Sequence, residues 1–80
     1  MGKICIVSKK TKIGDVKLHA FSNMQDAETF CINYLYNNST LEDRTYNKIE
    51  KSEFPSCTEF SLYTSQHGNI DLQIQEVCYD

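Results

Sequence analysis

Residues 22–35, with the sequence SNMQDAETFCINYL, decide the fold of this chain. Apolar side chains recur there at spacings of three and four, which places them on one face of a helix. These side chains are Ala27, Phe30, Cys31, Tyr34 and Leu35. Ser22, followed three residues later by Gln25, is a capping-box pattern, and the asparagines at 37 and 38 can end the helix in the left-handed conformation. The stretch therefore predicts one amphipathic helix whose apolar stripe faces a core.

A predicted β-hairpin precedes the helix. Residues 3–9 are rich in β-branched side chains, and Ile4, Ile6 and Val7 suit a strand that is buried on at least one face. Residues 16–21 alternate between apolar and polar types, and Gly14 can supply the turn between the two strands. The alternation places one set on each side of the strand: Val16, Leu18 and Ala20 inward, Lys17 and His19 outward.

A second hairpin is predicted after the helix. Ser39 with Glu42 repeats the capping pattern and indicates a short second helix over residues 41–49, which ends before Pro55. Residues 58–64 and 70–74 read as strands around a turn at 65–69. The alternation breaks at residues 77–79, which we interpret as a bulge or the last turn of the strand.

The order β-β-α-(α)-β-β predicts a single α+β domain over residues 1–80. Its simplest assembly is one antiparallel sheet with the main helix packed on one face. The opposite face is expected to be polar enough to stand in water. Its expected residues are Lys17, His19, Ser61, Tyr63, Asp71, Gln73 and Gln75.

The size and charge of the chain exclude several classes of protein. The 80 residues carry a net charge of -3 and support one small domain, which excludes a multidomain enzyme and a strongly basic nucleic-acid binder. No apolar run approaches the ~20 residues that span a bilayer, so we expect no membrane association. The charge is uneven, because residues 1–21 hold five lysines and one aspartate, whereas residues 22–80 hold three basic and ten acidic side chains.

The uneven charge suggests two contact surfaces. The first hairpin could contact phosphate or an acidic protein patch through its lysines. These are Lys9, Lys10, Lys12 and Lys17. An acidic surface could instead occupy a basic site on another protein, and its residues are Glu42, Asp43, Glu50 and Glu53.

Candidates for chemistry are few. The four cysteines form no Cys-x-x-Cys pair and have no zinc-finger spacing to His19 or His67, so we expect reduced thiols, no metal and no cofactor. Cys31 is the most tempting nucleophile, but it lies on the apolar helix stripe. With no nucleotide-binding or hydrolase motif, we expect no catalytic residues, no small-molecule substrate and no enzyme activity. The N-terminal residues lack the apolar core of a signal peptide, which favours an intracellular protein.

The residues Ala20-Phe21-Ser22-Asn23, followed by Ala27, Phe30 and Tyr34, resemble a pattern in short accessory and virion-associated proteins of large DNA viruses and phages. In those proteins a hairpin ends in a Phe-Ser step, and a helix and closing strands follow. The resemblance implies a small accessory or virion protein, located in the host cytoplasm or the virion, with no catalytic residues to transfer.

The sequence thus predicts a non-enzymatic protein-interaction module, either a minor virion component or a viral accessory protein. It would dock through an exposed sheet edge or face, with self-association as one version. The alternatives are nucleic-acid binding through the basic first hairpin, which is less favoured, and inhibition of a nucleic-acid-binding partner through the acidic surface.

Overall fold

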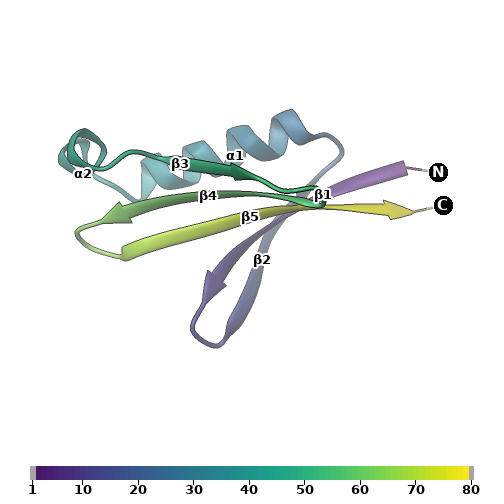
Figure 1. Ribbon diagram of the computed structural model, residues 1–80, viewed down its shortest axis with the longest axis horizontal. Coiled ribbons are helices and arrows are strands. Elements are labelled where there is room, and N and C mark those ends of the chain that lie inside the picture. Colours follow the sequence, from purple (N-terminus) through teal and green to yellow (C-terminus); the bar gives the residue numbers. More distant parts are fainter. Residues whose placement is uncertain (1, 80) are drawn as a thin grey trace.

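The computed structural model describes residues 2–79 and shows two helices and a five-stranded antiparallel sheet (Figure 1). The elements in chain order are β1 (Gly2–Thr11), β2 (Gly14–Phe21), α1 (Met24–Asn37), α2 (Leu41–Tyr46), β3 (Glu50–Glu53), β4 (Cys57–Thr64) and β5 (Gly68–Tyr79). The strand order is β2-β1-β5-β4-β3. The predicted α+β class, with the main helix on one face of an antiparallel sheet, is confirmed.

The first and last strands pair near the middle of the sheet. β1 and β5 run antiparallel from Gly2 opposite Tyr79 to Lys9 opposite Leu72. This pairing brings the N- and C-terminal ends together at the same end of the molecule (Figure 1). The two hairpins predicted from sequence therefore join through β1 and β5.

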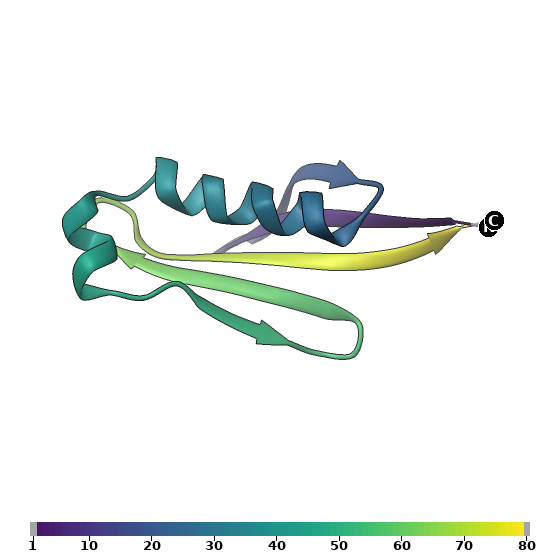
Figure 2. The ribbon, with the colours of Figure 1, turned by 90° about the horizontal axis from the view of Figure 1, so that it is seen from above.

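The core lies between α1 and one face of the sheet (Figure 2). Helix α1 contributes Ala27, Cys31 and Leu35, each fully buried, as the apolar spacing predicts. The strands contribute alternate residues because successive side chains of a strand point to opposite faces. Their buried apolar members are Cys5, Val7, Phe60, Leu62, Ile70, Leu72 and Ile74.

The caps of α1 differ from the prediction. The N-cap is Asn23 rather than Ser22, and its Oδ1 accepts a hydrogen bond from the backbone N–H of Asp26 at 2.8 Å. At the other end Asn38 has a φ of -108°, so it does not adopt the left-handed conformation. Its side-chain amide and its backbone N–H instead both donate to the Tyr34 carbonyl, at 2.8 and 3.2 Å, which closes the last turn of the helix.

The second helix forms, but it is shorter than residues 41–49. Helix α2 begins after Thr40, and Thr40 and Asp43 form the capping box in place of Ser39 and Glu42. The chain leaves the helix after Tyr46, and Ile49 then packs against the core. This packing, together with the start of β3, ends the helix early.

Two strand features were not predicted. β3 is an additional edge strand of four exposed residues that pairs with residues 58–61 of β4. Leu18 is an extra residue in β2, because Val7 pairs with His19 whereas Ser8 pairs with Lys17. This β-bulge turns His19 toward the helix and Ala20 away from it, so the predictions of an outward His19 and an inward Ala20 are wrong. Strand β5 continues in regular register through residue 79, so the interpretation of residues 77–79 as the end of the strand agrees with the structure and the alternative of a bulge is wrong.

Candidate interaction surface

The sheet face turned away from α1, here called the open face, is apolar at one end. Because Cys5 and Val7 point toward the helix, Ile4 and Ile6 point away from it. Register places three more apolar side chains beside them. We call the whole group the apolar end, and it consists of Ile4, Ile6, Ala20, Val77 and Tyr79.

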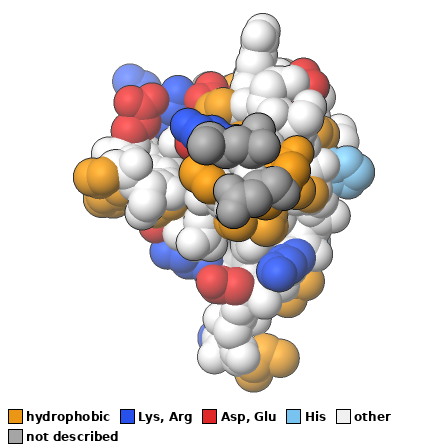
Figure 3. All heavy atoms as spheres, turned by 90° about the vertical axis from the view of Figure 1, so that its right-hand side faces the viewer, with side chains coloured by type: hydrophobic (Ala, Val, Ile, Leu, Met, Phe, Trp, Pro, Cys, Tyr) orange, Lys and Arg blue, Asp and Glu red, His pale blue; other side chains and the backbone are white. Residues whose placement is uncertain are grey.

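Solvent reaches this apolar end. Val77 is 39% exposed and Tyr79 is 52% exposed, whereas Ile4 and Ile6 are half-buried between their neighbours. An end-on view of the molecule, onto the right-hand side of Figure 1, shows hydrophobic side chains gathered near the centre of this end (Figure 3). A shallow hollow of about 280 Å³ lies here, lined by Lys3, Ile4, Ala20, Phe21, Ser22 and Tyr79.

The Tyr79 ring lies against the backbone of Gly2, its partner in the β1–β5 pair. A Cβ atom built on Gly2 would lie 2.6 Å from the Tyr79 Cζ and Oη atoms. The missing side chain therefore makes room for the ring on the neighbouring strand. An aromatic ring packed over a strand glycine in this way stabilises the pair and holds the ring in place.

The rest of the open face is polar, and one ion pair crosses its middle. The Lys10 Nζ reaches across β5 to the Glu59 Oε2 at 3.0 Å, and this hydrogen bond raises the pKa of Lys10. The Asn69 amide donates to both carboxylate oxygens of Asp71, at 2.9 and 3.0 Å. Except for His19, the polar residues predicted for this face lie on it.

The four predicted contact lysines do not all lie together. Lys9 points to the helix side, where its Nζ lies 6.0 Å from the centre of the Tyr34 ring, and Lys10 is held by Glu59 on the open face. Lys12 lies in the β1–β2 turn and Lys17 points to the open face opposite Ser8. Three of the lysines line a hollow of about 440 Å³ between the two hairpins, and its lining residues are Lys9, Lys10, Thr11, Lys12, His67, Asn69 and Asp71.

The predicted acidic surface is also divided. Asp43 is 7% exposed, and its carboxylate accepts hydrogen bonds from the backbone N–H groups of Thr40 and Ser65 at 3.0 and 3.1 Å. These hydrogen bonds favour the charged carboxylate and therefore lower the pKa of Asp43. The bond from Thr40 contributes most to this shift. Asp43 thus ties α2 to the β4–β5 turn and is not part of an exposed surface. Glu42, Glu50 and Glu53 are exposed.

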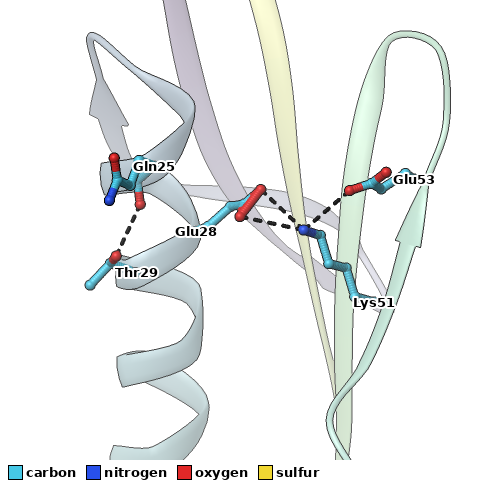
Figure 4. Close-up of polar contacts among 5 residues, drawn as sticks. All are labelled: Gln25, Glu28, Thr29, Lys51 and Glu53. Atoms are coloured by element: carbon cyan, nitrogen blue, oxygen red, sulfur yellow. Dashed lines mark hydrogen bonds and ion pairs between the residues drawn. The ribbon is translucent and has the colours of Figure 1, made fainter.

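Two of these exposed acids belong to β3, where they point to opposite faces. Glu50 pairs with Ser61 on the open side, whereas Glu53 pairs with Thr58 on the helix side. Lys51 joins Glu53 to Glu28 of α1, with Nζ–O distances of 3.1 and 3.3 Å (Figure 4). This bridge fixes the β3 edge against the helix.

A second exposed aromatic region lies where α2 ends and β3 begins. Tyr46 is 80% exposed and Tyr63 is 58% exposed. They flank a polar groove of about 510 Å³, whose other lining residues are Asn47, Lys48, Glu50, Ser61, Leu62 and Asn69. The groove exists because β3 covers only residues 58–61 of β4 and leaves residues 62–64 without a strand on that side.

Cys31, the candidate nucleophile from the sequence, is a core residue. Cys31 is fully buried, and burial raises the pKa of its thiol to about 12, with a smaller contribution from Glu28. At neutral pH the thiol stays protonated, which makes it a poor nucleophile. His19 stacks on Phe30 with ring centres 5.7 Å apart, and His67 lies in the β4–β5 turn.

Comparison with family models, with curated proteins and with solved structures finds no match for this chain. Within residues 2–79, no group of three or more His, Cys, Asp or Glu side chains converges to hold a metal ion. The helices of the same residues are too short or too polar to cross a membrane.

Proposed function

We propose that this protein is a protein-interaction module and that a partner protein docks on the apolar end of its open face. The observation that carries the proposal is an uncovered sheet face with apolar side chains on three adjacent strands. An antiparallel sheet face that remains in water is normally polar. Exposed apolar patches rimmed by polar residues mark sites of protein contact.

The composition of the apolar end fits such contact. Tyr79 offers a large, rigid side chain with a polar tip, a type that is enriched at binding hot spots. Val77 and Ile4 are paired neighbours that can form the dry centre of an interface. A stable interface covers roughly 800 Å² on each side, so the partner would extend over the polar part of the face as well.

The side chains of the polar part suit the rim of an interface. Gln73 and Gln75 can exchange hydrogen bonds with water for hydrogen bonds with a partner. The Lys10–Glu59 ion pair leaves little net charge near the middle of the face. We therefore expect the partner to present an apolar patch with a neutral polar border, and the complex to depend little on salt.

Site-specific photo-cross-linking in the native source tests this proposal. A photoreactive phenylalanine analogue replaces Tyr79 in one version and Tyr63 in a matched control, because both tyrosines lie on the open face with similar exposure. We expect a discrete protein adduct from position 79 and a much weaker one from position 63. Equal adducts from both positions, or none from position 79, would contradict the proposal.

The other functions remain predictions. For nucleic-acid binding, Lys10 is engaged by Glu59 and Lys9 points to the helix side, so the hairpin offers fewer free charges than its sequence indicates. For the acidic inhibitor, Asp43 is turned inward onto backbone N–H groups. The viral or phage accessory role also remains a prediction.

A further inference from the structure

The two edges of the sheet differ in how well they are protected against pairing with another strand. Edge strands expose unpaired backbone N–H and C=O groups, and charged or short edges discourage pairing. β3 has four residues, and its Lys51 is already engaged by Glu53 and Glu28. β2 has eight residues. Among the described residues, neither Asp15 nor Lys17 of β2 makes an ion pair.

The β2 edge is complementary to itself. Its segment Asp15-Val16-Lys17 places one acid and one base on either side of an exposed valine. We propose that two copies of this chain pair through their β2 strands, antiparallel, about a two-fold axis at Val16. In this register Asp15 of each copy lies opposite Lys17 of the other.

The side-chain directions agree with this register. Asp15 pairs with Lys10, and Lys17 pairs with Ser8, so both point to the open face. Val16 points to the helix side and is 48% exposed, which leaves it free to contact Val16 of the second copy. Opposite charges directly across an antiparallel pair are stabilising, and like charges are destabilising.

Charge also favours the register with its axis at Val16 over the adjacent register. Moving the axis by one residue to Lys17 would place the two lysines opposite each other. Pairing further along the strand meets the bulge at Leu18 and then the start of α1. The segment is complementary to a second copy of itself, which is what a two-fold interface requires, and we therefore take the occupant to be a second copy.

The dimer would form a continuous sheet with both helices on one side. The two open faces would then point in the same direction and present the apolar end twice. The pairing uses a different surface from the proposed docking site, so it stands independently of the proposed function. The paired segment is short, and we therefore expect a weak dimer that forms at high protein concentration.

Sedimentation velocity over a concentration series up to millimolar tests the proposal. We expect wild type to dimerise, and Asp15→Lys or Lys17→Asp alone to raise the dissociation constant by about tenfold or more, because both cross-pairs become repulsive. The double exchange Asp15→Lys with Lys17→Asp should restore the dimer. An equimolar mixture of the two single variants should also dimerise, because each then offers only the charge the other needs.

Circular dichroism tests whether each variant is folded. If a charge-reversed variant does not fold, the milder variant Lys17→Gln takes its place. This neutral variant removes both attractions without adding repulsion, so we expect a smaller increase in the dissociation constant. A wild type that stays monomeric at every concentration would overturn the proposal. So would single variants that dimerise as wild type does, or a mixture that fails to associate.

Discussion

Replacing isoleucine by alanine should lower the free energy of unfolding by different amounts on the two faces of the sheet. Ile74 of β5 and Ile6 of β1 lie in neighbouring interior strands, but Ile74 is fully buried under α1, whereas Ile6 is half-buried on the open face. Ile74→Ala removes three carbon atoms, or about 2.4 kcal/mol of transfer free energy. The unfilled cavity raises the expected loss to about 3 to 4 kcal/mol.

At Ile6 the expected loss is about 1 kcal/mol or less, because solvent already reaches the side chain and no closed cavity forms. Part of this loss is the lower β-propensity of alanine, which affects both variants.

Urea unfolding followed by circular dichroism measures the difference. A chain of this size is expected to have a free energy of unfolding of about 4 to 12 kcal/mol. With a urea slope of about 1 to 1.5 kcal/mol/M, Ile74→Ala should lower the midpoint by roughly 2 to 4 M, and Ile6→Ala by less than about 1 M. Equal losses at the two positions would refute the reasoning, because Ile6 would then belong to a closed core rather than to an available surface.

Three further predictions concern caps, pH and thiols. Thr40→Ala should lower the free energy of unfolding by about 1 kcal/mol through loss of the α2 capping box, whereas Thr40→Ser should retain it in the same urea assay. The pKa of Asp43 is lowered in the fold, so its contribution to stability is present above the unfolded pKa of about 3.9 and is lost as pH falls through the folded value. The difference in urea midpoint between wild type and Asp43→Asn should therefore shrink below about pH 4, and a constant difference would contradict this cause. In thiol labelling at pH 8, exposed Cys78 should react at once and Cys31 only after denaturation; labelling of native Cys31 at the rate of Cys78 would contradict its burial.

The main helix could be predicted from sequence because its apolar spacing is long and unambiguous. The end points were less certain, since several adjacent residues can act as caps. Asn23 replaced Ser22, and Thr40 replaced Ser39, in each case by a shift of one residue. All four side chains carry an oxygen that can accept from a backbone N–H, so local chemistry alone does not choose among them.

The sheet shows where a local pattern is insufficient. The alternation in β2 predicted an outward His19, but the extra residue at Leu18 reversed the faces beyond it. β3 carries no apolar side chain, so its sequence gives no strand signal. It forms because it pairs with the edge of β4.

The candidate surface could not be predicted for a related reason. Ile4 and Ile6 indicate a strand with apolar side chains on both faces, and periodicity cannot tell which face a helix will cover. Only the pairing of β1 with β5 places Val77 and Tyr79 beside them. Lys10 and Asp43 were visible in the sequence, but their partners Glu59 and Ser65 lie far away along the chain.

The central claim is that a partner protein docks on the apolar end. The affinity of the cross-linked partner for variants of that end tests this claim most directly. The purified partner is titrated with wild type, with Val77→Lys and with Gln73→Lys, a control four residues earlier on the same strand and the same open face. Burying an unpaired lysine in a dry interface is costly, so Val77→Lys should weaken binding by about tenfold or more, whereas Gln73→Lys at the rim should change it by about twofold or less. Unchanged affinity for Val77→Lys, or an equal loss for both variants, would contradict docking at the apolar end.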